Sequence, residues 1–205
     1  MRRLFARDLT ASDTARLTGL SGRAVHAVYW RLRRRLQAWC AVPAEVGGAV
    51  ELAERYFGPR RIRGKRGRGA GRKTIVFGLV KRGGQLYTEI VPDCSKKTWQ
   101  GVMRGQIAVA AMVNTDGWHG DDGLVDVGFD GPFRVGHGQD EVVFGAWHLN
   151  GIDSFWRFAK ARLQQFRGVP KHPFLLPLKE SEFRFNQRHK DLYKLLLQLL
   201  RQQPR

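Results

Sequence analysis

The stretch Trp147–Lys160, WHLNGIDSFWRFAK, joins a helix start to an acidic residue. Asn150 and Gly151 are suited to the start of the helix, and apolar and polar stripes follow them at helical spacing. The apolar stripe consists of Ile152, Phe155, Trp156, Ala159, Leu163 and Phe166, and the polar stripe of Asp153, Arg157, Lys160 and Gln164. Asp153 is therefore expected at the rim of a buried face, where a functional site can form. The alternative is an amphipathic surface helix in which Asp153 and Arg157 form an ordinary ion pair.

The same stretch resembles a signature of insertion-sequence transposases. HLNGIDSFW, followed by Lys160, is similar to the pattern H-x-N-G-I-[E/D]-x-F-W…K of DDE transposases in the ISXO-type group. The similarity continues in GVPKHPF (168–174) and LKESEFRFN (178–186), and it reaches back to VELAERYFG (50–58). It covers roughly residues 45–186. The resemblance implies an α/β fold, in which a ribonuclease H-like mixed sheet with flanking helices binds and cuts DNA.

The charge of the chain indicates a polyanionic partner. Lys and Arg number 36 and Asp and Glu 18, which gives a net charge of +18 at pH 7. This excess favours nucleic acid, bound with an affinity that falls steeply as salt rises. An anionic membrane surface is the alternative, but no apolar run approaches the ~20 residues that span a bilayer. The N-terminus also lacks the apolar core of a signal peptide. We therefore expect a cytoplasmic protein with no membrane partner, and the resemblance implies a prokaryotic, nucleoid-associated one.

Cys40 and Cys94 lie far apart and match no zinc-ligand spacing, so we expect two reduced thiols. Many members of the wider family that the chain resembles carry an N-terminal zinc ribbon. No such ribbon, and hence no zinc, is expected here.

Two helices are predicted near the N-terminus, over Ser12–Thr18 and Ser21–Ala38. Gly19 provides the turn, and Ser21 is a favourable N-cap. The spacing of the small and aliphatic residues on either side of Gly19 is typical of a helix-turn-helix. The buried side of the second helix is expected to consist of Val25, Val28, Leu32 and Leu36. The side that faces solvent or DNA is expected to consist of Arg23, His26, Tyr29, Arg31, Arg33, Arg34 and Arg35. Of these, Arg23 and His26 should lie nearest the bases and the Arg31–Arg35 cluster nearest the phosphates. A plain helical hairpin with a solvated basic face is the alternative.

Residues 59–73, PRRIRGKRGRGAGRK, are basic and rich in Gly, and they contain no acid. Such a run cannot pack into a core, and we expect a solvated loop until phosphates neutralise it. The functional interpretation is an arm that follows the DNA backbone without sequence choice. Its contacts would come from Arg60, Arg61, Arg63, Lys65, Arg66, Arg68, Arg72 and Lys73.

Alternation in residues 50–57 predicts a strand, and Ala53 stands where the family motif V-E-x-D-E-x-Y-F-G has its first metal-binding Asp. Asp116, in NTDGW, resembles the second acid of the family, although a simple turn Asp is the alternative. Between Ala53 and Asp116, the sequence pattern predicts a hairpin (74–79 and 85–91), a helix (95–105) and a buried strand (107–115). After Asp116 it predicts a short strand (133–135).

The resemblance implies two Mg²⁺ or Mn²⁺ ions, held by hard carboxylate oxygens from separate elements. The three acid positions correspond to Ala53, Asp116 and Asp153, so only Asp116 and Asp153 are available as metal ligands. Lys160, two helical turns beyond Asp153, is suited to hold a phosphate. Asn150 and His148 are suited to hydrogen-bond the scissile phosphate or a ligand carboxylate.

No neighbour is a good substitute for the missing acid at position 53. Glu54 points to the opposite face of the strand, and Glu51 shares the face but lies about 6.6 Å away along it. We therefore predict that the chain binds transposon-end DNA and cuts it poorly or not at all.

The predicted organisation is a helix-turn-helix domain (1–42), a ribonuclease H-like domain that contains the basic loop (43–188), and a C-terminal helix (189–205). A turn at 168–174 and a helix at 180–188 precede this last helix. Its stripe, Leu192, Leu195, Leu196 and Leu199, either docks on the catalytic domain or meets a second protomer.

The leading function is a bacterial insertion-sequence transposase that acts as a homodimer on double-stranded DNA, both transposon ends and target. One alternative is a non-catalytic helix-turn-helix DNA-binding protein derived from a transposase. A basic RNA-binding protein is another, but it explains the charge and not Asp116, Asp153 or the motif around them.

Overall fold

The structure is a computed structural model that describes residues 1–40, 49–58, 73–81, 84–103, 112–115, 134–135, 150–166 and 174–202. The chain divides into two compact units, one of residues 1–41 and 161–205 and the other of residues 42–160. Each unit is built around an apolar cluster of its own. Among the helices in these described ranges, none has the length and hydrophobicity needed to cross a membrane.

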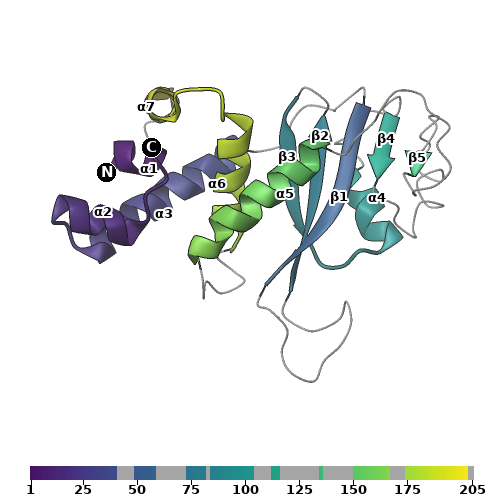
Figure 1. The fold of residues 1–205 in the computed structure, drawn as a ribbon, viewed down its shortest axis with the longest axis horizontal. Helices are drawn as coiled ribbons and strands as arrows, with labels where there is room; N and C mark the ends of the chain where they lie inside the picture. Colours follow the sequence, from purple (N-terminus) through teal and green to yellow (C-terminus); the bar gives the residue numbers. More distant parts are fainter. Residues whose placement is uncertain are drawn as a thin grey trace, which may run out of the picture. The chain divides into compact units, whose positions relative to one another are not determined.

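The unit of residues 42–160 contains a five-stranded sheet in the order β3-β2-β1-β4-β5 (Figure 1). The strands are β1 (Ala49–Phe57), β2 (Thr74–Lys81), β3 (Leu86–Val91), β4 (Met112–Thr115) and β5 (Arg134–Val135). The pairs β1–β2 and β2–β3 are antiparallel, whereas β4 runs parallel to β1 and β5 parallel to β4. The predicted hairpin and the strand at 50–57 are confirmed. The predicted strand at 107–115 is confirmed for its last four residues, and its earlier residues lie outside the described part.

One face of the sheet is covered by α4 (Lys96–Met103). Val50 and Leu52 of β1 join Phe77 and Leu79 of β2 in a buried cluster, because alternate side chains of a strand share a face. Helix α4 adds Trp99, Val102 and Met103 to this cluster, and the Trp99 ring meets that of Phe77 edge-on at 4.8 Å. Because Val50 and Leu52 lie on the α4 side of the sheet, the residues of β1 that alternate with them lie on the opposite face.

The other face is covered by α5 (Asn150–Leu163), the predicted helix (Figure 1). Its stripe is buried as expected at Ile152, Phe155, Trp156 and Ala159, whereas Leu163 is only half-buried. Gly78 of β2 allows the close approach of this helix, because a Cβ there would lie 2.7 Å from a ring carbon of Trp156. Burial of this stripe holds the beginning of α5, with Asp153, against β1 and β2.

The unit of residues 1–41 and 161–205 is helical. It contains α1 (Arg2–Ala6), α2 (Ala11–Thr18), α3 (Gly22–Trp39), α6 (Leu175–Asn186) and α7 (Leu192–Gln202), with the end of α5 and a short 3₁₀ helix (Gln164–Phe166). Phe5, Tyr29 and Leu36 from the N-terminal helices share one buried cluster with Phe183 of α6 and Leu196 of α7. The first and last segments of the chain therefore fold around one core.

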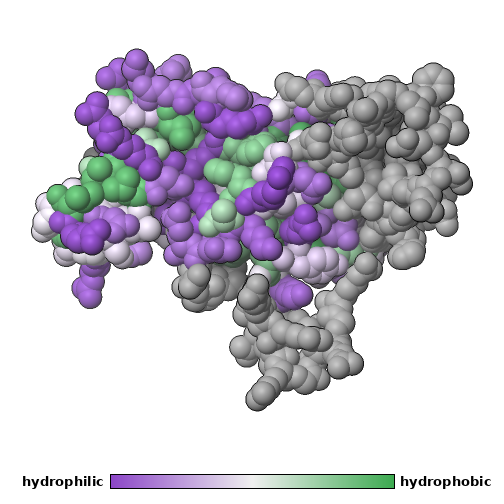
Figure 2. Space-filling model, in the orientation of Figure 1, coloured by the Kyte–Doolittle hydropathy of each residue, from purple (hydrophilic) through white to green (hydrophobic). Residues whose placement is uncertain are grey.

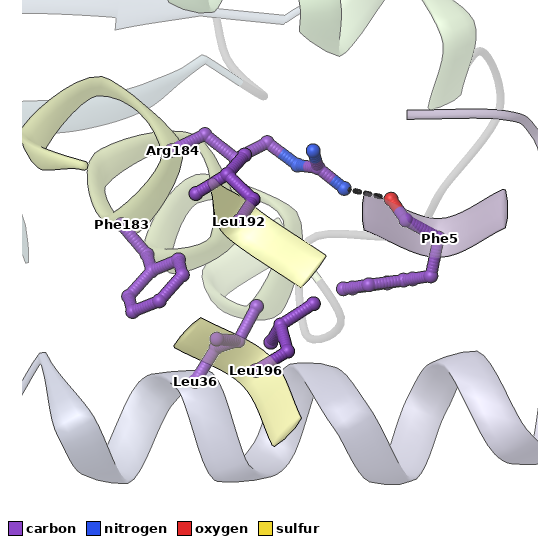
Figure 3. A pocket seen from close by; sticks show the side chains of 6 residues that line it. All are labelled: Phe5, Leu36, Phe183, Arg184, Leu192 and Leu196. Carbon is purple, nitrogen blue, oxygen red and sulfur yellow. Dashed lines mark hydrogen bonds between the residues drawn. The ribbon is translucent and has the colours of Figure 1, made fainter. Parts of the chain in front are cut away.

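This arrangement differs from the predicted organisation. The Leu-rich stripe of α7 packs on the N-terminal helices, whereas the alternatives expected from the sequence were the catalytic domain and a second protomer. Figure 3 shows Phe5, Leu36, Phe183, Leu192 and Leu196 turned toward one another from α1, α3, α6 and α7. The physical reason is that the apolar side chains of α1 and α3 are buried in one cluster with Phe183 of α6 and Leu196 of α7.

Helix α6 begins earlier than predicted, at Leu175 and not at 180. The earlier start includes Pro177, which lies within the first turn, where a missing backbone N–H costs no helical hydrogen bond. The additional turn places Lys179 and Glu180 inside the helical unit, and both are buried.

A buried ionic network joins α6 to the N-terminal helices. Glu180 is 1% exposed, and its carboxylate lies 2.8 Å from Arg33 Nε, 2.6 Å from Arg162 Nη2 and 2.9 Å from Arg184 Nη2. Arg162 also pairs with Asp8 at 2.7 Å. Burial raises the pKa of Glu180, but the three guanidinium groups outweigh this effect and lower the pKa to about 2.

Candidate functional site

The α2–α3 pair has the predicted turn and caps. Gly19 ends α2 in the left-handed conformation, with φ 69°, which favours glycine. The Ser21 hydroxyl accepts a hydrogen bond from the backbone N–H of Ala24 at 3.2 Å, which caps α3. Val25 is fully buried between the helices, as its spacing predicted. The local geometry is therefore that of two helices joined by a tight turn, with the N-terminus of α3 near the turn.

Two residues predicted to face solvent or DNA are buried instead. Tyr29 is 0% exposed, and its hydroxyl lies 2.6 Å from that of Thr14; burial raises its pKa. Arg33 is also buried, since its guanidinium pairs with Glu180. Tyr29 lies on the buried stripe itself, four residues after Val25 and three before Leu32, whereas Arg33 flanks the stripe and is covered by Glu180 from a segment distant in sequence. The rest of the predicted set on α3 is exposed at Arg23, His26, Arg31 and Arg34, and half-buried at Arg35.

Trp30 is a surface residue that the sequence analysis missed. It is 37% exposed, and it lies seven residues after Arg23, three after Ala27 and four before Arg34, on the side of α3 opposite Val25. In the view of Figure 2 the described surface is mostly hydrophilic, with smaller apolar areas between. Trp30 thus presents an aromatic ring within a basic helix face. The helical spacing that identified the buried stripe of α3 would also have identified this exposed face and Trp30 on it.

The face of β1 that carries position 53 meets the first turn of α5. Glu51 and Arg55 share this face with Ala53, because they are two residues away on either side. The Glu51 carboxylate accepts a hydrogen bond from the backbone N–H of Ile152 at 3.0 Å. Arg55 Nη2 lies 3.5 Å from Asp153 Oδ1. Ala53, which is 4% exposed, therefore lies between two residues that both contact the turn bearing Asp153.

Neither Glu51 nor Arg55 was given a functional role from the sequence. Glu51 was excluded as a substitute ligand, and its contact with α5 gives it another role, since a carboxylate at a helix N-terminus satisfies an unpaired N–H. A Cβ at Gly151 would lie 3.1 Å from this carboxylate, so Gly151 allows the close approach. No sequence signal reveals this contact, because it joins residues 101 positions apart.

The other predicted site residues are only partly covered by the structure. Asn150 is the first residue of α5, and Lys160 is exposed further along the same helix. Asp116 and His148 lie outside the described residues, as does the basic loop apart from Lys73, which is exposed. The pairing of β1 with β4 ends at Leu52 with Thr115, and these two residues precede Ala53 and Asp116 in the sequence.

Comparison with known proteins gives a family. The chain matches the family model described as an ISXO2-like transposase domain over residues 45–186. It is also 36% identical over 102 residues to an uncharacterized transposase-like protein of Haemophilus influenzae, a match that covers 50% of this chain and 81% of that protein. The matched range includes the sheet, α5 and α6. On this evidence, the chain belongs to the ISXO2-like transposase family.

Proposed function

We propose that this protein is a bacterial insertion-sequence transposase that binds terminal inverted repeats, with a cleavage site made incomplete by Ala53. The observation that carries the proposal is the position of Ala53 on β1. Its two neighbours on the same face, Glu51 and Arg55, contact the first turn of α5, where Asp153 lies. Ala53 and Asp153 match two acid positions of the family, and they thus lie on elements, β1 and α5, that contact each other directly.

The sheet supports a ribonuclease H-like catalytic domain. Its order, β3-β2-β1-β4-β5, combines an antiparallel set of three strands with two parallel additions beside β1. The third acid position fits the same site, since Asp116 follows Thr115, and Thr115 pairs with Leu52 beside position 53. Acids at 53, 116 and 153 would then converge at one end of the central strands.

The donor set at this site does not suit a pair of divalent cations. Mg²⁺ and Mn²⁺ favour oxygen ligands, and Ala53 offers only a methyl group where the family has a carboxylate. The Glu51 carboxylate is engaged with a backbone N–H of α5, and Asp153 pairs with Arg55. DNA binding, rather than DNA cleavage, is therefore the activity that we propose for the unaltered chain.

The DNA-binding surface that we propose is the exposed face of α3, as a recognition helix, with the basic loop as an arm on the phosphates. The net charge of +18 and the exposed Arg23, His26, Arg31 and Arg34 support this interface. Arg33 is excluded from it by its burial. We expect a homodimer to hold paired transposon ends in the prokaryotic cytoplasm.

Binding to labelled duplexes tests the proposal. The chain should bind a duplex that carries the terminal inverted repeat more tightly than a random duplex of equal length or an RNA of equal length. Equal affinity for all three would contradict the proposal and favour a non-specific basic nucleic-acid binder. Because phosphate contacts release counterions, each affinity must be compared at several salt concentrations.

A non-catalytic DNA-binding protein derived from a transposase is the second candidate, and Ala53 is the observation that favours it. Cleavage of repeat ends by Ala53→Asp in Mg²⁺ or Mn²⁺, alone or combined with Arg55→Gln, separates the two candidates. Gained cleavage supports a transposase with one missing ligand. Unchanged inactivity of both variants, with DNA binding retained, counts against the transposase and favours the second candidate.

A further inference from the structure

We propose that Arg55, held by Asp153, forms a phosphodiester-binding site in which a guanidinium supplies the positive charge that divalent cations would otherwise bring. The proposal rests on the proposed DNA binding. It assigns a ligand class to the site beside Ala53, and it makes Asp153 the counter-ion of Arg55 and not a metal ligand.

The first step is the geometry of the pair. Arg55 Nη2 lies 3.5 Å from Asp153 Oδ1, and the two side chains are 53% and 56% exposed. A guanidinium carries five N–H donors in a planar fork, so one contact with Asp153 leaves donors directed to solvent. A phosphate can therefore reach Arg55 without displacing Asp153.

The second step is the lack of competing acid among the described residues around the pair. Ala53 carries no charge, and the Glu51 carboxylate is engaged with the N–H of Ile152. In the described ranges, no group of three or more His, Cys, Asp or Glu side chains is arranged to hold a metal ion. The charge of Asp153 is then balanced by the guanidinium of Arg55, which contacts its Oδ1.

The third step is the charge of the surrounding surface. Arg157 and Lys160 follow Asp153 by four and seven residues on α5, and both are exposed on the same side of the helix. With Arg55, they place three cations against the two acids Asp153 and Glu51. Among the residues that the structure describes here, the cations outnumber the acids, which favours a phosphodiester ligand.

DNA is the polyanion that fits this surface. The chain carries twice as many basic as acidic residues, 36 against 18, and belongs to a transposase family. The bidentate fork of Arg suits phosphate oxygens better than a Lys ammonium does. The ligand is therefore a backbone phosphate of duplex DNA, bound without sequence choice.

The test is the affinity of the full-length chain for a terminal-repeat duplex, measured in EDTA and again in Mg²⁺ at matched ionic strength. Arg55→Gln should weaken binding about three- to tenfold and reduce the salt slope by about one. Lys97→Gln, which removes one exposed charge from α4 on the opposite face of the sheet, is the matched control and should change the affinity less than twofold. Arg55→Lys should retain part of the affinity.

The sign of the effect at Asp153 decides between the two roles of that residue. Asp153→Asn should strengthen binding a few-fold, equally in EDTA and in Mg²⁺, because it removes a negative charge beside the phosphate. Weaker binding by this variant in Mg²⁺ alone would identify Asp153 as a metal ligand and overturn the proposal. Equal effects of Arg55→Gln and Lys97→Gln would also overturn it.

Different results would contradict the proposed function and this inference. A wild-type chain without preference for the terminal repeat contradicts the proposed function, whereas the Arg55 and Asp153 effects concern any duplex. A wild-type chain that binds no duplex at all overturns both. Thermal melting of each variant, expected within a few degrees of wild type because both side chains are half-exposed, shows that the comparison is made between folded proteins.

Discussion

At the scale of single residues, Gly78 fixes the distance between the sheet and α5. A Cβ at this position would lie 2.7 Å from one ring carbon of Trp156 and 3.1 Å from Ile152 Cδ1, both in buried side chains. We predict that Gly78→Ala lowers the free energy of unfolding by about 1–3 kcal/mol, because the indole must move within a packed layer.

Gly101→Ala is the control for this substitution. Gly101 lies in α4, and a Cβ there would meet nothing within 4 Å. Alanine favours a helix over glycine, so this variant should be unchanged or more stable by up to about 1 kcal/mol. Urea unfolding of both variants measures the difference, and equal stabilities would show that Trp156 does not lie where we describe it.

Glu180 gives the protein a predicted dependence on acid. Its pKa is lowered to about 2 in the folded protein, below the ordinary value of 4.5, because Arg162, Arg184 and Arg33 outweigh the effect of burial. The stabilisation from a lowered carboxylate pKa is present above the unfolded value and is lost as the pH falls toward the folded one. We therefore predict a loss of thermal stability between about pH 4.5 and pH 2.

Glu180→Gln isolates this effect from that of the other carboxyl groups. The variant should be less stable by about 3–5 kcal/mol at pH 7, since three buried guanidinium groups lose their counter-ion. Its melting temperature should change less than that of wild type between pH 4.5 and pH 2. Parallel pH profiles of the two proteins would contradict the role that we give to Glu180.

Single residues also show where inference from the sequence ends. Asp153 at the rim of a buried stripe was predicted correctly, because its exposure follows from its own helix. Tyr29 was predicted wrongly although its spacing from Val25 and Leu32 places it on the buried stripe. Arg33 was predicted wrongly because its burial depends on Glu180, which lies 147 residues beyond it. Helical spacing reports the face on which a residue lies, and it cannot report how widely the partner covers that face.

At the scale of elements, α3 is the helix whose exposed face we propose to read DNA. Trp30 lies in the middle of that face, so Trp30→Ala should weaken binding to the terminal-repeat duplex by about tenfold, or ~1.4 kcal/mol. Leu17→Ala, at a 63% exposed residue of α2, is the control for loss of exposed apolar surface and should bind almost normally. Fluorescence anisotropy with the labelled duplex measures both, and normal binding by Trp30→Ala would place the DNA elsewhere.

The elements themselves were largely predictable. Alternation identified β1 and the hairpin, and helical spacing together with the Ser21 cap and Gly19 identified α2, α3 and α5. The beginning of α6 was missed by five residues, since the helix was predicted from residue 180 and begins at Leu175. The sequence identified only those residues of the candidate site that belong to the family motif. Glu51 and Arg55 were missed because each contacts a residue about a hundred positions away in the sequence.

At the scale of the whole molecule, the N-terminal helices depend on a segment at the other end of the chain. Leu196 of α7 is 2% exposed among Phe5, Leu36 and Phe183, and Arg184 of α6 donates a hydrogen bond to the backbone carbonyl of Phe5 (Figure 3). The sequence showed the stripe of α7 but not its partner, because any apolar face of matching width would fit it.

This dependence gives a prediction for a residue far from any DNA contact that we propose. Leu196→Ala should cost about 2–5 kcal/mol of stability in the helical unit, because it leaves a cavity in the cluster shared by α1, α3, α6 and α7. Removal of residues 189–205 should have a larger effect and should also weaken DNA binding, since α3 then loses part of its support. Circular dichroism should show a loss of helix greater than α7 itself contributes. If the shortened chain keeps the helicity of α1–α3, the melting temperature of the intact protein and its affinity for DNA, then the N-terminal helices fold independently and the shared core contributes nothing to recognition.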